Sequence, residues 1–205
     1  AVTDLCAKAA GVPVYQWLGD HGVATRKAVR VYANINRGAR DRSPEGIAAA
    51  ARHAVEQGYG AVKIAPFDGV YWGDANESEK LRRTQAGIAR VRAIREAVGP
   101  DIDIMVDCHW RFDERGAQRL LHELQGVRLY WIECPVTENS DSFALLQRIH
   151  AGARASDMKL AGAERQIGCS GFAPFVDDGL LDVVMPDVKY AGGYGEMLRI
   201  AARCA

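Results

Sequence analysis

The sequence lacks any close pair of cysteines. Its five cysteines are odd in number and scattered, and no two of them form a Cys-x-x-Cys pair. This spacing argues against a disulfide framework and against a structural zinc site, and it fits a reducing compartment. We therefore expect a cytoplasmic protein.

An excess of charge and a long apolar run are also lacking. The 26 basic residues balance the 26 acidic ones, so the formal net charge is +0 and no global field attracts nucleic acid or an anionic membrane. No apolar run approaches the ~18 residues of a membrane-spanning helix. The first residues include Asp4 and Lys8, which predicts no signal peptide. We expect neither nucleic acid nor a membrane as a partner.

Short apolar runs alternate with helical patterns along the whole chain. Six runs are predicted as strands, at 29–35, 61–67, 102–107, 129–135, 159–164 and 181–187. The predicted helices lie at 43–58, 78–98, 114–125, 140–152, about 170–179, and 193–205. Helix-end signals support these boundaries: Ser43 is a good N-cap, Pro44 suits the first turn, and Gly58 suits the stop.

This alternation predicts an α/β fold with a parallel sheet, because the strands are apolar on both faces. No glycine-rich phosphate loop follows the first strand, which argues against a dinucleotide-binding sheet. Polar residues end nearly every strand, as in a (β/α) barrel. A full barrel needs eight strands, and six are present. We predict a partial barrel over 26–205, preceded at 1–25 by a helix and a turn.

Three carboxylates end successive predicted strands. They are Asp107, Glu133 and Glu164, separated by 26 and 31 residues, close to the ~30 residues of one βαβ unit. In neighbouring parallel strands such side chains converge at the C-terminal edge. They would repel one another unless a hard divalent cation lay between them. The spacing therefore predicts a magnesium site and an enzyme.

Several segments together resemble the mandelate racemase/muconate lactonizing branch of the enolase superfamily. The opening AVTDLCAKAAGVPVYQWLGD resembles the linker helix between the capping domain and the barrel, and VRVYANIN and VKIAPF resemble the first two barrel strands. VD-x-H, WIECP, GAER and MPDVKYAGG resemble strands three to six. The resemblance implies a Mg²⁺-dependent enzyme that removes the proton α to a carboxylate and stabilises an enediolate. It also implies that Asp107, Glu133 and Glu164 hold the metal.

The acid–base residues indicate the reaction within the family. Racemases commonly place a Lys-x-Lys pair after the second strand, but here Lys63 is followed at the second position by Ala65. DCHWR resembles the Asp-x-His-x-Arg of sugar-acid dehydratases, in which the histidine, here His109, protonates the departing hydroxide. Asp187 resembles the aspartate that orients a strand-seven histidine, the base that takes the α-proton. The catalytic set implied is thus His109, Asp187 and Lys63.

Other positions are implied by the same resemblance. Arg165 and Asn34 are candidate substrate contacts, Arg165 because Glu-Arg occurs in some dehydratases. Cys134 departs from the family pattern, since many relatives carry a second acid there, and this removes a charge near the metal. Relatives are often oligomers, so a homo-oligomer acting on a small sugar acid is implied.

Three interpretations of function stay open. The first is a lyase that dehydrates a sugar acid to a 2-keto-3-deoxy acid. The second is a racemase or epimerase of a hydroxy acid, against which Ala65 weighs. The third is an inert fragment that keeps the fold and the ligands without turnover, a possibility raised by the missing strands and their unpaired edges.

Overall fold

The computed structural model describes residues 2–26, 28–71, 73 and 76–205. Six parallel strands form one sheet in the order in which they occur along the chain. They are β1 (Ala33–Asn34), β2 (Ala61–Ile64), β3 (Asp103–Asp107), β4 (Trp131–Glu133), β5 (Lys159–Gly162) and β6 (Val183–Val184). The predicted fold, six strand–helix units of a barrel, is confirmed.

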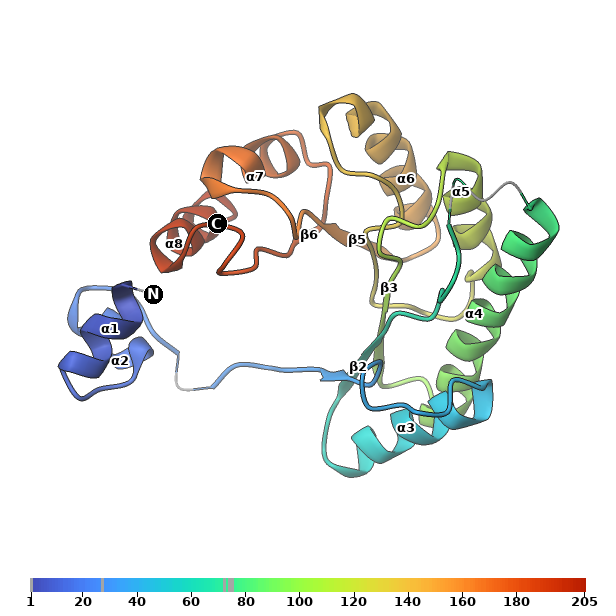
Figure 1. Ribbon diagram of the computed structural model, residues 1–205, viewed down its shortest axis with the longest axis horizontal. Coiled ribbons are helices and arrows are strands. Elements are labelled where there is room, and N and C mark those ends of the chain that lie inside the picture. The colour runs from blue at the N-terminus through green and yellow to red at the C-terminus, as the bar shows by residue number, and fades with distance from the viewer. Residues whose placement is uncertain (1, 27, 72, 74–75) are drawn as a thin grey trace.

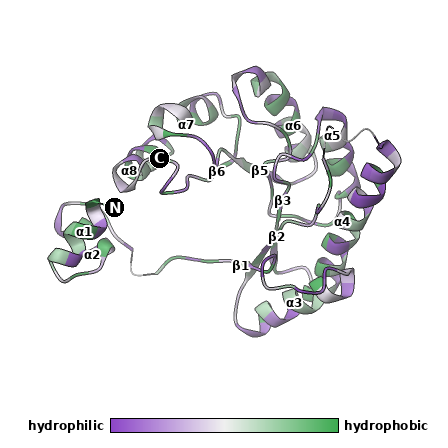
Figure 2. Ribbon diagram, viewed as in Figure 1, coloured by the Kyte–Doolittle hydropathy of each residue, from purple (hydrophilic) through white to green (hydrophobic). Residues whose placement is uncertain are grey.

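A helix follows each strand. These helices are α3 (Pro44–Glu56), α4 (Glu77–Val98), α5 (Glu114–Glu123), α6 (Phe143–Ala155, after the 3₁₀ turn Ser140–Ser142), α7 (Gly168–Asp177) and α8 (Tyr194–Arg203). Figure 1 shows them in chain order along the outside of a curved, open sheet. In Figure 2 hydrophobic and hydrophilic residues are mixed around each helix, as expected where one face packs on a core.

The helix boundaries follow the expected local signals. The Ser43 side chain accepts a hydrogen bond from the Gly46 amide at 3.0 Å, and Pro44 opens α3. Gly58, just beyond α3, and Gly99, the C-cap of α4, have φ values of 90° and 74°. A side chain with a Cβ disfavours that conformation, so glycine ends both helices at low cost.

The two faces of the sheet are buried by different partners. Val62, Ile104, Val106, Ile132 and Leu160 pack against helix residues in the main core. The alternate positions form a second cluster without a helix residue, made of Ala61, Met105, Trp131 and Ala161. Because side chains alternate along a strand, this second face also carries the residues two positions further on. We call it the inner face.

The two edge strands are shorter than predicted. Within the run 29–35 the strand register covers Ala33 and Asn34, and within the run 181–187 it covers Val183 and Val184. Single backbone hydrogen bonds from Ile35, Asp182 and Met185 extend the pairing slightly beyond these residues. β1 and β6 each have a single neighbouring strand, and the apolar side chains of Val29 and Val31 are 75% and 63% exposed. The apolar runs therefore predicted where the edge strands lie but overestimated how many of their residues pair with a neighbouring strand.

Residues before the sheet form two short helices instead of the single predicted helix. α1 (Val2–Ala9) and α2 (Val14–Asp20) are separated by Gly11, with φ 69°, and by Pro13, the N-cap of α2. Figure 1 shows an extended segment leading from them to β1. None of the helices in the described part of the chain is both long and apolar enough to span a bilayer.

Candidate functional site

Three ionisable side chains meet where the strands end on the inner face. Lys63 lies two residues after Ala61 in β2, Asp107 two after Met105 in β3, and Glu133 two after Trp131 in β4. Asp107 and Glu133 are direct register partners. Strand periodicity therefore places all three on one face, and parallel pairing places them at one edge.

These groups form a buried ionic cluster. Lys63 Nζ lies 2.6 Å from Glu133 Oε1 and 3.4 Å from Asp107 Oδ2. The indole of Trp131 donates a hydrogen bond of 3.0 Å to the other oxygen of Glu133. All three ionisable residues are buried. We refer to Lys63, Asp107, Glu133 and the adjoining His109 as the strand-end cluster.

When Lys63, Asp107 and Glu133 are all ionised, these three groups carry one more negative than positive charge. Burial raises the pKa of Glu133 to about 7, and the charge of Asp107 adds to that shift while Lys63 opposes it. Burial would lower the pKa of Lys63, but the two carboxylates outweigh it and raise that pKa. The ammonium is thus firmly charged, and one carboxylate has no full counter-charge.

His109 adjoins this cluster through Asp107. Its ring Nε2 lies 3.1 Å from Asp107 Oδ2, and its backbone amide donates to Asp107 Oδ1 at 3.1 Å. The hydrogen bond to Asp107 raises the pKa of His109, against the effect of partial burial. β3 ends at Asp107 and His109 has φ 49°, so a turn, and not continued strand alternation, brings the ring back to the carboxylate.

Glu164 is not brought into the same cluster. β5 ends at Gly162, Ala163 has φ 68°, and Glu164 lies in the following turn, half-buried. The left-handed backbone of Ala163 interrupts the strand alternation of side chains between the two sheet faces, which the prediction for Glu164 assumed. Within the described residues no group of three histidine, cysteine or acidic side chains is arranged to hold a metal ion.

The donors that do converge suit a hard divalent cation. Asp107 and Glu133 offer carboxylate oxygens, the ligands preferred by Mg²⁺. They already attract the ammonium of Lys63, and when both are ionised they carry one more charge than that ammonium balances. Two of the three predicted ligands therefore fit a magnesium ion, and the assignment of Glu164 stays a prediction.

Asn34 and Asp187 lie at other strand ends. Asn34 is the register partner of Lys63, is exposed, and accepts a hydrogen bond of 3.1 Å from the Asn36 amide. Asp187 follows β6 and accepts from the amides of Lys189 and Tyr190 at 2.7 and 3.2 Å. Within the described part of the chain neither side chain is hydrogen-bonded to the strand-end cluster.

Glu138 joins the loops around the strand-end cluster, a position that the sequence did not reveal. Its Oε2 accepts from the Trp110 indole at 3.0 Å and from the Ala163 amide at 3.1 Å, so it ties together the loops after β3, β4 and β5. The guanidinium of Arg165, a predicted substrate contact, stacks over the Trp110 ring at 4.0 Å from the ring centroid. A glutamate in a polar loop gives no sequence signal for such a role.

Glu138 also lies beside the departure from the family pattern. Burial raises its pKa, and the thiol of Cys134 is one of its neighbours. Its other oxygen, Oε1, is buried and has no hydrogen-bond donor in place among the described residues. An acid is therefore present next to Cys134, supplied from four residues further along the chain.

Comparison with known families gives one extended match. The sequence model of a family described as "Enolase C-terminal domain-like" matches residues 46–205, well over half of the chain.

Individual relatives agree with that match. A D-gluconate dehydratase from Thermoproteus tenax is 33% identical over 203 residues, covering 98% of this chain and 38% of that protein. A D-galactonate dehydratase from Pectobacterium atrosepticum is 31% identical, covering 98% and 48%. The crystal structure of an enolase-superfamily member from Salmonella Typhimurium superimposes with a TM-score of 0.81 at 28% identity, covering 100% of this chain and 53% of that one. The chain thus spans about half the length of these relatives, or less.

Proposed function

Because the chain belongs to the enolase C-terminal domain-like family, we propose that it supplies catalytic residues for the dehydration of a sugar acid to a 2-keto-3-deoxy acid. The relatives named above as D-gluconate and D-galactonate dehydratases support this class of substrate. The observation that carries the proposal is the strand-end cluster, in which a histidine, two carboxylates and a lysine meet at one edge of a parallel sheet.

The proposed reaction is a β-elimination. A base removes the proton on the carbon α to the substrate carboxylate, the electron pair forms a carbon–carbon double bond, and the β-hydroxyl departs with a proton as water. The enol that remains tautomerises to the keto acid. The α-proton is weakly acidic because its removal leaves two negative charges on one small group, so the site must stabilise charge as well as move protons.

His109 is the proposed donor of the proton to the departing hydroxyl. Its ring is half-exposed, with 43% of the side chain accessible, while Asp107 holds Nε2 at 3.1 Å. A histidine is suited to proton donation near neutral pH. Lys63 contributes positive charge that offsets part of the charge of Asp107 and Glu133, which would lower the repulsion met by a substrate carboxylate at this edge.

The remaining roles are proposed from the sequence motifs. Asp107, Glu133 and Glu164 would hold a Mg²⁺ ion, which when bound stabilises negative charge on the substrate carboxylate. Asp187 would orient the base that takes the α-proton. Arg165, held on the Trp110 ring, and Asn34, beside Lys63 in the sheet, would contact the substrate.

A substrate screen tests the proposal. The purified protein is incubated with Mg²⁺ and a panel of aldonic acids in deuterated water, and keto-acid formation and α-deuterium incorporation are both measured. Elimination gives a keto acid. An epimer carrying deuterium, with no keto acid, indicates the racemase or epimerase alternative. Neither product from any member of the panel, with Mg²⁺ bound, indicates an inert protein.

A further inference from the structure

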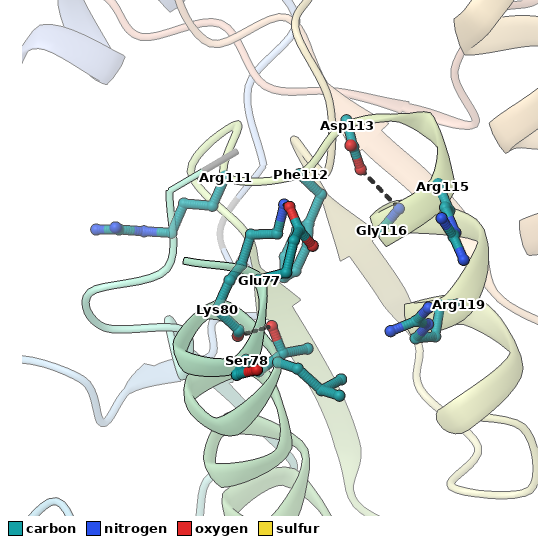
Figure 3. A pocket seen from close by; sticks show the side chains of 11 residues that line it. Glu77, Ser78, Lys80, Arg111, Phe112, Asp113, Arg115, Gly116 and Arg119 are labelled. Carbon is teal, nitrogen blue, oxygen red and sulfur yellow. Dashed lines mark hydrogen bonds and ion pairs between the residues drawn. The ribbon is translucent and has the colours of Figure 1, made fainter. Parts of the chain in front are cut away.

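A second candidate site lies outside the strand-end cluster, in a cavity of about 330 Å³ between α4 and α5. The N-terminal turns of α4 form one wall and the first turns of α5 form the other. Phe112 and Asp113, in the loop from β3 to α5, also line the cavity. Figure 3 shows Arg119 extending from α5 toward α4, with Arg115 above it in that view. The cavity is within the size range of small-molecule sites, although at the low end.

Two arginines of this cavity differ from the other basic residues around it. Each of the six basic side chains of α4 is engaged by an acid or a backbone carbonyl, including Lys80, which lines the cavity and pairs with Glu77 at 2.6 Å. In contrast, within the described residues Arg115 and Arg119 of α5 make no hydrogen bond, ion pair or ring contact.

Their placement on α5 is electrostatically unfavourable. Asp113 is the N-cap, so Arg115 lies in the first turn, where the helix dipole disfavours a cation. Arg119 follows four residues later, and like charges at that spacing repel on a helix surface. Both costs are relieved if an anion binds between the two side chains and α4.

The acids that line the cavity do not neutralise these arginines. Asp113 Oδ1 accepts a hydrogen bond of 2.7 Å from the Gly116 amide, which caps α5. The carboxylate of Glu77 forms an ion pair with Lys80. Arg111 also lines the cavity, but its guanidinium already donates a hydrogen bond of 2.8 Å to the Val70 carbonyl. Among the residues that the structure describes, no acid pairs with these two guanidiniums, which belong to exposed side chains lining a concave site.

We propose that this cavity binds a phosphate-type dianion between Arg115 and Arg119. The planar donor fork of a guanidinium matches two oxygens of a phosphate at once, and a dianion neutralises both charges. The same chemistry is offered by inorganic phosphate and by the phosphate group of a sugar phosphate. This site is separate from the proposed dehydration and does not depend on it.

Calorimetric titration at constant ionic strength tests the proposal. Inorganic phosphate and glucose 6-phosphate are titrated separately into the wild-type protein and into Arg115→Gln and Arg119→Gln, with glucose as a blank. Saturable 1:1 binding of at least one phosphate ligand is expected. Each substitution should weaken it about tenfold or more, because charge-assisted hydrogen bonds are lost. The stronger of the two ligands identifies the source of the phosphate group.

Arg52→Gln is the matched control, since Arg52 is exposed on α3 and has no partner in the described part of the chain. It should bind phosphate as the wild type does. Without phosphate, Arg115→Gln and Arg119→Gln should melt at the wild-type temperature or above it, because a repulsion is removed; this also verifies folding. Absence of saturable binding of both ligands to the wild type, or an equal loss of affinity in Arg52→Gln, overturns the proposal.

Discussion

Lys63 and Glu133 meet across an intervening strand. Lys63 belongs to β2 and Glu133 to β4, yet Nζ and Oε1 are 2.6 Å apart, and Asp107 of β3 lies between them at 3.4 Å from the same ammonium. A buried pair that loses one partner leaves an uncompensated charge in a poorly solvated position. This lysine therefore supports the strand-end cluster as well as any chemistry there.

Replacing Lys63 by methionine should destabilise the fold. The side chain keeps its length but leaves two buried carboxylates without a cation, and loss of a partner from a buried ion pair costs about 3–5 kcal/mol. Urea unfolding measures the change. Lys80→Met is the control, because the Glu77 partner of Lys80 is 78% exposed and such pairs contribute about 1 kcal/mol or less. Equal effects of the two substitutions would contradict a structural role for Lys63.

Stability should fall with pH because of Glu133. Its pKa is raised from 4.5 to about 7 in the fold, so the folded state holds this proton more tightly than the unfolded chain does. The contribution is complete below about pH 4.5 and is lost as pH rises through about 7. Urea unfolding measures the free energy of unfolding at about pH 5 and about pH 8. Its decrease between the two should be larger for the wild type than for Glu133→Gln, because glutamine cannot titrate. Identical losses would show that another group controls the change.

His109→Asn should remove dehydration without removing the metal. Asparagine can still hydrogen-bond Asp107 but cannot donate a proton to the departing hydroxyl, so turnover should fall about 10²–10⁴-fold. Mg²⁺ affinity measured by calorimetry should be retained. His53→Asn is the control, since that histidine is exposed on α3. Dehydration at the wild-type rate in His109→Asn excludes His109 as the acid.

Metal affinity discriminates among the three proposed ligands. Asp107→Asn and Glu164→Gln should each weaken Mg²⁺ binding about tenfold or more, because even residues that only support metal ligands have effects of that size. Glu114→Gln, which affects an exposed pair with Arg148 and a hydrogen bond from Gln118 on α5, should not. Unchanged affinity in Glu164→Gln together with a loss in Asp107→Asn would remove Glu164 alone from the set.

Gly162→Ala should destabilise the protein through Glu138. A Cβ at Gly162 would overlap Glu138 Oε1, and moving that carboxyl breaks its bonds to Trp110 and Ala163. We expect a cost of about 1–3 kcal/mol. In the Glu138→Ala background the cost should be smaller, which a double-mutant cycle measures. Gly195→Ala, where the added Cβ meets open space in α8, should be neutral or stabilising. Additive effects in the cycle would refute the contact.

Local patterns in the sequence were sufficient for the strand–helix order. Apolar runs, Ser43, Pro44, Gly58 and Gly99 act within a few residues, so the predicted helices and strands exist at those places. The edge strands came out shorter, because pairing depends on a neighbour that a single run cannot specify. Asp107 and Glu133 lie side by side at neighbouring strand ends because both are in phase with buried strand residues, and their role as metal ligands stays a prediction.

The sequence alone determined an alternating α/β chain with carboxylates at the ends of its strands, since periodicity and turn chemistry are local. Only the tertiary structure decided which of those groups touch. Lys63 reaches Glu133 across β3, Glu138 joins three loops, and the left-handed Ala163 leads Glu164 out of phase. Such contacts depend on the backbone direction after a strand ends and on side chains that are distant in sequence. The side-chain periods of a strand (two residues) and of a helix (3.6 residues) encode neither of these.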